Sequence, residues 1–270
     1  MSKTLATLIE DVRGVFLNGV SSDTSELCKE FGGRMAKMLE ARLKEYGKTR
    51  PKSLRLSSIG KSELQLWHEI KGGFVGEPLS ADTLLKFLYG DIIEEVLLTI
   101  TEAAGHTVER RQETVELDGI VGHIDAVIDG ELVDVKSASS YSFEKFENGT
   151  MKDDDAFGYV YQMGAYATAL GKKRGYFFAM DKTLGHICLL EQNEWPDVHK
   201  RISYLKACMS SDAPPEYRCS IRTDKTGQMY LGVPCSYCPT KNACCKGKIE
   251  TVFTPSGKPK FLISKDTTDK

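Results

Sequence analysis

The sequence has no long apolar run, and this absence excludes a helix that spans a membrane. Its longest apolar stretches, such as that from Val96 to Ile100, fall far short of the roughly 20 residues that cross a bilayer. The first residues, Met-Ser-Lys-Thr-Leu, also lack the apolar core of a secretion signal. The sequence therefore predicts a cytoplasmic protein, in the host cytoplasm if a phage encodes it, with no membrane partner.

A strong net charge is missing as well. The 36 Lys and Arg residues face 38 Asp and Glu residues, which gives a net charge of −2. The molecule as a whole is therefore not a polycation, and any site for nucleic acid must be a local patch. There is no internal repeat and no Gly/Ser linker. With 41% hydrophobic and 27% charged residues, the chain has the composition of an ordinary globular protein.

The densest basic stretch runs from Arg42 to Lys61, with seven basic residues and one acid. Lys52, Arg55 and Lys61 in this stretch are candidate contacts for a phosphate backbone. The alternative is a solvated loop, which is the ordinary interpretation of such a charge run when no other feature indicates a polyanionic partner.

Hydrophobic periodicity predicts alternating helices and strands. Helices are expected over 5–16, 25–46, 80–104, 157–170 and 195–209. Strands are expected over 108–117, 120–128, 131–137, 175–180 and 186–191, with Asp129-Gly130 as a hairpin turn. This order of elements predicts an α/β fold with a central mixed sheet flanked by helices.

Acidic residues gather around the predicted hairpin. Alternation in a strand sends Asp134 and Lys136 to one face, and the hairpin brings Asp125 alongside them. Two carboxylates and one ammonium on a single patch favour a hard divalent cation such as Mg²⁺ or Mn²⁺, which can activate a water against a phosphodiester. Alternatively, the acids cap turns and Lys136 forms a surface ion pair. Glu94 on the preceding helix, and Gln162 with Tyr166 on the next one, favour the metal site.

This ordered set resembles the PD-(D/E)xK nuclease superfamily, and within it the RecB-like nucleases and the phage exonucleases related to lambda exonuclease. The resemblance implies that Glu94, Asp125 and Asp134 are metal ligands and that Lys136 is the catalytic lysine. It also implies that the family's Gln-x-x-x-Tyr element, here Gln162 to Tyr166, helps to hold DNA. The sequence departs from the family in two places: no proline precedes Asp125, and Glu94 stands where many RecB-like members have a histidine.

The same resemblance implies a metal-dependent deoxyribonuclease, most readily a phage-type exonuclease in recombination or DNA processing. Its partner would be DNA, with a homo-oligomer or a recombination partner such as a single-strand annealing protein as further expectations. The expected organisation is an N-terminal helical extension (1–75), a nuclease core (76–212), a Cys-rich metal-binding segment (213–250) and a disordered tail (251–270).

Four of the eight cysteines lie between Cys235 and Cys245. The spacing Cys235-x2-Cys238-x5-Cys244 is typical of a metal site, and Cys219 can supply a fourth thiolate. In the iron-sulfur members of the RecB-like group the fourth cysteine lies far upstream, where this chain has Lys61 and Ser62. We therefore expect a structural zinc ion, with a 4Fe-4S cluster and reduced, metal-free thiols as alternatives, and Cys245 as the spare residue.

Other functions stay open at this stage. The same fold also hosts endonucleases, and a non-catalytic DNA-binding module could retain it. A zinc-ribbon interaction protein is a third class, in which the acids would be surface residues. Cleavage polarity, the preference for single or double strands and the oligomeric state are not determined by the motif.

Overall fold

The structure is a computed structural model that describes residues 3–20, 22–48, 53–72, 79–216, 219–245, 247–255 and 259–264. Its helices are η1 (Leu5–Thr7), α1 (Leu8–Asn18), α2 (Ser25–Glu45), η2 (Leu56–Ser58), α3 (Glu63–Ile70), α4 (Ala81–Ala103), α5 (Ser140–Glu147), η3 (Met151–Asp153), α6 (Tyr159–Ala169), α7 (Val198–Ser210), α8 (Val233–Ser236) and α9 (Lys241–Cys244). Its strands are β1 (Val108–Glu109), β2 (Thr114–Leu117), β3 (Ile120–His123), β4 (Ala126–Ile128), β5 (Glu131–Ala138), β6 (Gly175–Asp181), β7 (Ile187–Gln192), β8 (Ile221–Thr223), β9 (Met229–Leu231), β10 (Lys248–Phe253) and β11 (Pro259–Ser264).

The central sheet is mixed, as predicted. Its strands lie in the order β1-β4-β5-β6-β7, with β5 and β6 parallel and the other pairs antiparallel. The parallel pair arises because α5 and α6 carry the chain from β5 back to the start of β6, as a crossover requires. Strand β5 is therefore the inner strand at which the hairpin and the crossover meet.

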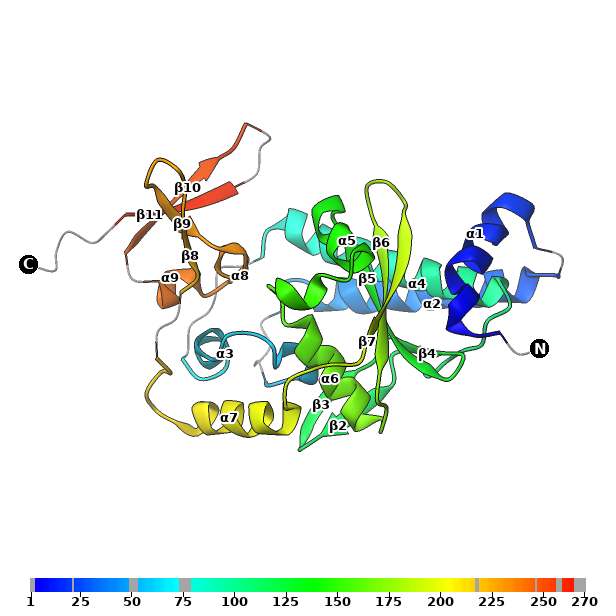
Figure 1. Cartoon of the computed structure of the whole chain (residues 1–270), viewed down its shortest axis with the longest axis horizontal. Coiled ribbons are helices and arrows are strands. Elements are labelled where there is room, and N and C mark those ends of the chain that lie inside the picture. Colours follow the sequence, from blue (N-terminus) through cyan, green and yellow to red (C-terminus); the bar gives the residue numbers. More distant parts are fainter. Residues whose placement is uncertain are drawn as a thin grey trace, which may run out of the picture.

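Helices cover both faces of this sheet (Figure 1). On one face, α1 and α4 pack against side chains such as Val133, Val135 and Phe178. On the other face, α5, α6 and α7 pack against side chains such as Leu132 and Phe177, together with the small β2-β3 sheet. A strand covered on both faces has few places for a charge, so any buried acid on β5 needs a partner there.

The C-terminal part carries a second sheet, in the order β10-β11-β9-β8, and lies to one side of the core in Figure 1. We expected a disordered tail over 251–270. This is wrong for residues 251–253, which belong to β10, and for the six residues of β11, which pair along their length with β10. The composition around this strand is typical of a loop, because Pro, Ser and Gly precede it. Residues 265–270 lie outside the described part of the chain.

The predicted strand over 108–117 is also interrupted. Arg110 and Gln112 take positive φ angles of 54° and 51°, a left-handed conformation that few residues other than glycine adopt. The chain turns there, so that the backbone N–H of Gln112 donates to the carbonyl of Asp125 at 3.1 Å. No helix within the described residues has the length and hydropathy to cross a membrane.

Candidate active site

Glu94 lies on α4, whose start is fixed by the side chain of Ser80, which accepts a hydrogen bond from the N–H of Thr83. The Glu94 carboxylate accepts a hydrogen bond of 2.6 Å from Nε2 of Gln112. Burial raises the pKa of Glu94 to about 7, against the lowering effect of the Gln112 hydrogen bond, and the negative charge of Asp134 raises it further. This carboxyl group is thus in an environment that disfavours its charge.

Asp125 lies in the bend between β3 and β4, directly before the hairpin. Its Oδ2 accepts a hydrogen bond of 2.8 Å from the backbone N–H of Val135 on the neighbouring strand. Burial raises the pKa of Asp125 well above its usual value, and the charges of Asp134 and Glu94 add to the effect. The three acids are therefore close enough to repel one another.

Asp134 and Lys136 point to the same side of β5, as alternation predicts, and they form an ion pair. The Asp134 side chain is almost fully buried, and its Oδ1 accepts a hydrogen bond of 2.9 Å from Nε2 of Gln162. Burial alone would lower the pKa of Lys136, but the charges of Asp134 and Asp125 outweigh this effect and raise it. The lysine is therefore held as a largely buried cation among carboxylates.

Helix α6 packs next to the acids and carries Gln162 and Tyr166. Gln162 holds Asp134, whereas Tyr166 on the next turn is only 2% exposed. Gly122 leaves room for this ring, because a Cβ there would lie 2.7 Å from Cε1 of Tyr166. Gln162 thus contacts the site and Tyr166 packs in the core, and a direct contact of either with DNA stays a prediction.

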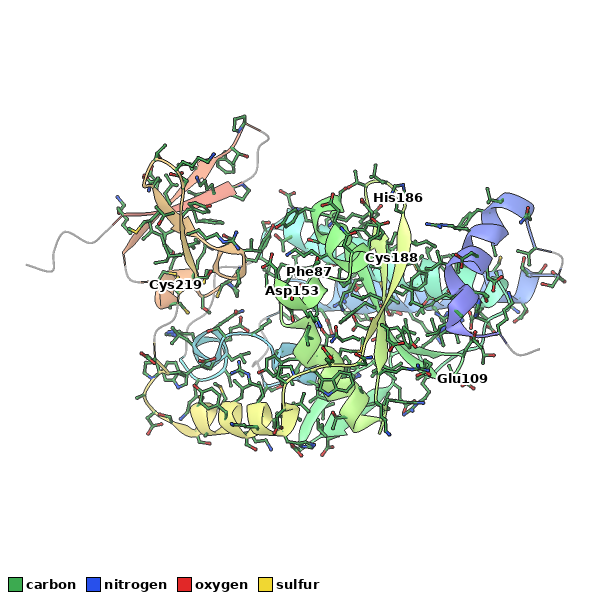
Figure 2. The ribbon with its side chains drawn as sticks, in the orientation of Figure 1. Phe87, Glu109, Asp153, His186, Cys188 and Cys219 are labelled. Carbon is green, nitrogen blue, oxygen red and sulfur yellow. The ribbon has the colours of Figure 1, made fainter. Side chains whose placement is uncertain are left out.

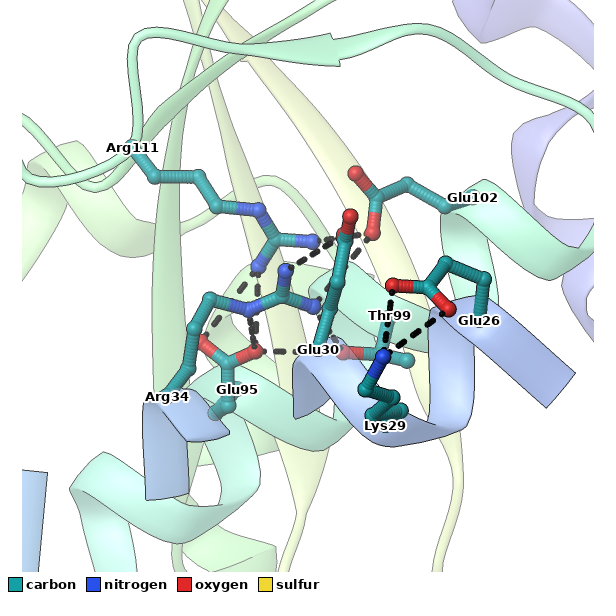
Figure 3. A network of polar contacts seen from close by, with 8 residues as sticks. All are labelled: Glu26, Lys29, Glu30, Arg34, Glu95, Thr99, Glu102 and Arg111. Atoms are coloured by element: carbon teal, nitrogen blue, oxygen red, sulfur yellow. Dashed lines mark hydrogen bonds and ion pairs between the residues drawn. The ribbon is translucent and has the colours of Figure 1, made fainter. Parts of the chain in front are cut away.

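A network of ion pairs fixes the rotation of α4 next to Glu94 (Figure 3). Arg34 on α2 contacts Glu95 at 2.6 Å, and Arg111 contacts Glu102 at 2.5 Å and Glu95 at 3.4 Å. Successive residues of a helix point about 100° apart. Because Glu95 is held toward α2 and Arg111, its neighbour Glu94 is turned toward the other acids.

The basic stretch serves partly in structural contacts. Arg42 forms two hydrogen bonds with Asp91, at 2.6 and 2.9 Å. Lys52 lies outside the described residues, and Arg55 is exposed at the start of η2. The backbone carbonyl of Lys61 accepts a hydrogen bond of 2.6 Å from Arg201 on α7. The packing of η2 and of Gly60 against α6 thus brings Arg55 and Lys61 near this helix.

The C-terminal cysteines form two groups. Sγ of Cys219 lies 3.7 Å from Sγ of Cys235, and Cys245 shares side-chain hydrogen bonds with both. Cys238 and Cys244 instead contact each other and share the hydroxyl of Thr240, at 3.1 and 3.4 Å. Cys245, which we expected to be the spare residue, thus belongs to the group of Cys219 and Cys235. In Figure 2, Cys219 belongs to this C-terminal part, whereas Cys188 lies on β7, far across the molecule.

Nowhere in the described part of the chain are three or more His, Cys, Asp or Glu side chains arranged to hold a metal ion directly. The acids instead take Gln112, the N–H of Val135 and Lys136 as partners. Sequence reasoning missed Gln112, because a lone glutamine in a turn carries no signal of its contact. It also missed Tyr159, whose ring lies 4.8 Å from Nζ of Lys136.

No protein-family model and no curated protein sequence matches this chain. Among solved structures the chain is similar to a protein designated SSO0001, with a TM-score of 0.44, over 82% of this chain and 98% of that one. It is also similar to an alkaline exonuclease from Laribacter hongkongensis, with a TM-score of 0.43, over 58% of this chain and 88% of that one. A phage-related exonuclease from Haemophilus somnus 129PT gives a TM-score of 0.40, over 58% of this chain and 90% of that one. Each is 15% identical to this chain.

Proposed function

We propose that this protein is a metal-dependent deoxyribonuclease that hydrolyses phosphodiester bonds in DNA. The observation that supports the proposal is the convergence of three mutually repelling carboxylates, Glu94, Asp125 and Asp134, on one buried lysine. A structural ion pair needs only one acid for each base. The extra buried negative charge costs stability unless it serves to bind a cation.

The donor set suits Mg²⁺ or Mn²⁺, since all three acids offer oxygen atoms and no soft ligand is present among them. Glu94, Asp125 and Asp134 would hold the ion in exchange for their present hydrogen-bond and ion-pair partners. When bound, a divalent cation supplies neutralisation of the phosphate charge and a lower pKa for a coordinated water. Burial and the neighbouring acids raise the pKa values of Glu94 and Asp125, and a bound cation would offset this effect.

The chain's own residues do the positioning. Lys136 is held by Asp134 and by the face of Tyr159, so its ammonium group can orient a nucleophile or stabilise the charge on the phosphate. Gln162 fixes Oδ1 of Asp134, and Gln112 fixes Glu94, so neither carboxylate rotates freely.

An exonuclease is the form of the activity that we favour, as the sequence resemblance implies. The test is incubation of the purified chain with end-labelled linear DNA and with closed circular DNA, each with and without magnesium. Loss of label from linear DNA only, and only with magnesium, is the expected result. Cleavage of circular DNA would identify an endonuclease, and binding without cleavage of either DNA would identify a non-catalytic module and refute the proposal.

The C-terminal cysteines belong to the same proposal as ligands of a structural zinc ion, with a 4Fe-4S cluster as the alternative. Thiolates at Cys219, Cys235, Cys238 and Cys244 were expected from spacing, and the contacts of Cys245 make it a further candidate. Elemental analysis distinguishes the cases: about one zinc per chain supports the proposal, iron with a brown absorbance indicates the cluster, and neither metal refutes both.

A further inference from the structure

A row of aromatic side chains leads from the catalytic lysine to the C-terminal part of the chain. The ring of Tyr159 lies 4.8 Å from Nζ of Lys136. Phe157 follows with its ring centroid 5.6 Å from that of Tyr159, and Tyr237 follows with its centroid 5.9 Å from that of Phe157. The row therefore joins α6 to the loop between Cys235 and Cys238, which are far apart in the sequence.

Exposure increases along this row. Tyr159 packs on Phe146 and Phe177 of the core, with centroids 6.3 and 6.4 Å away. Phe157 is 40% exposed, and Tyr237 is 74% exposed. Rings that only filled the core would be covered by other side chains. Here the outer two rings present their surfaces to solvent, and the inner end of the row is at the lysine.

The loop that carries Lys61 runs beside this row. Its neighbour Gly60 lies against Gly158, so closely that a Cβ on Gly60 would be 2.4 Å from the Cα of Gly158. Gly158 separates Phe157 from Tyr159 in the chain. The backbone contact thus brings the segment that carries Lys61 close to the segment that carries Phe157 and Tyr159. Basic and aromatic residues together are typical of surfaces that bind unpaired nucleic acid.

From this juxtaposition we infer that the exposed rings of Phe157 and Tyr237 form a stacking track for the unpaired bases of a DNA end, and that this track guides the strand past Tyr159 to the carboxylates. The inference rests on the proposed function and specifies its substrate. Aromatic rings stack on bases of any sequence, but only where the base faces are free. In a duplex the bases cover one another, so the track selects a single-stranded or frayed end.

The test is equilibrium binding of the full chain to a fluorescent oligo-dT of 12 nucleotides and to a 12-base-pair duplex, in buffer without added magnesium or manganese so that neither is cleaved. One base-stacking contact corresponds to about a 5- to 150-fold change in affinity. Tyr237→Ala and Phe157→Ala should weaken oligo-dT binding by that factor and change duplex binding by less than about twofold. Tyr237→Phe, which keeps the ring, should retain the affinity.

Phe253→Ala is the matched control, because Phe253 is 71% exposed on β10 in the same C-terminal part but outside the row. Unchanged oligo-dT binding in Tyr237→Ala, or an equal loss for oligo-dT and duplex, would overturn the inference. A parallel cleavage assay with magnesium separates the two proposals. If the wild type cleaves DNA but the alanine variants bind oligo-dT as well as the wild type does, only the track is refuted. If the alanine variants lose oligo-dT binding but the wild type does not cleave DNA, only the nuclease proposal is refuted.

Discussion

Replacement of Glu94 by glutamine should make the metal-free protein more stable while it abolishes cleavage. The pKa of Glu94 is raised from 4.5 to about 7 in the folded chain. A raised carboxyl pKa means that the folded state prefers the protonated form. The favourable contribution of Glu94 to the free energy of unfolding is therefore complete below pH 4.5 and is lost as the pH rises through about 7. In the variant the side chain stays neutral, and its amide oxygen can still accept the hydrogen bond from Gln112.

The magnitude follows from the size of the shift. Each pKa unit corresponds to about 1.4 kcal/mol, so the rise from 4.5 to about 7 amounts to at most about 3.5 kcal/mol at pH 8. Glu94→Gln should gain this amount over the wild type at pH 8 and very little at pH 4.5. Urea denaturation in EDTA at both pH values measures the two differences.

Magnesium provides the second half of this test. At pH 8, added magnesium should stabilise the wild type, because a ligand that binds only the folded state adds to its stability. It should stabilise Glu94→Gln much less, since one ligand has lost its charge. Glu116→Gln is the control, because Glu116 is exposed on β2. The role given to Glu94 would be refuted if Glu94→Gln were no more stable than the wild type at pH 8, or if magnesium stabilised Glu94→Gln as much as it stabilises the wild type.

Four further predictions concern other parts of the molecule. Asp134→Asn should lower the cleavage rate with magnesium at least about 100-fold without loss of the fold, and a wild-type rate would remove Asp134 from the site. Neutralising Lys52 and Arg55 together should lower the slope of log affinity against log salt by about one for each lost phosphate contact, and an unchanged slope would make the stretch a solvated loop. Cys235→Ser should release the thiolate-bound metal and lower the melting temperature, and an unchanged metal content in this variant would contradict the assignment of Cys235 as a ligand. In the wild type, treatment with EDTA followed by added magnesium should restore cleavage. Gly60→Ala should cost about 1–3 kcal/mol in urea denaturation, because its Cβ would overlap the backbone of the α6 N-cap, and a neutral effect would show that this contact is loose.

Local periodicity in the sequence was enough to predict most of the long helices and strand β5, which carries Asp134 and Lys136. The predicted long helix over 80–104 corresponds to α4, with Ser80 at its N-cap. Alternation along β5 placed Asp134 and Lys136 on one face, and their ion pair confirms it. These features depend on residues a few positions apart, whose relative direction follows from the repeat of a helix or a strand.

The tertiary structure alone decided how the site is held together. Gln112 contacts Glu94 only because Arg110 and Gln112, both in the left-handed conformation, turn the chain there. Neither the composition nor the spacing of the sequence predicts that turn. Cys245 joins Cys219 through contacts across 26 positions of sequence, and β11 pairs with β10 despite a composition that indicates disorder.

The physical reason is the range of the interactions involved. A helix or strand signal is carried by side chains that are neighbours in sequence, so it can be read one element at a time. The charge environment of Glu94 and Asp125 depends on burial and on acids that come from α4, the β3-β4 bend and β5. The sequence by itself determined which residues could form an acidic site, and only packing determined which partners hold them there.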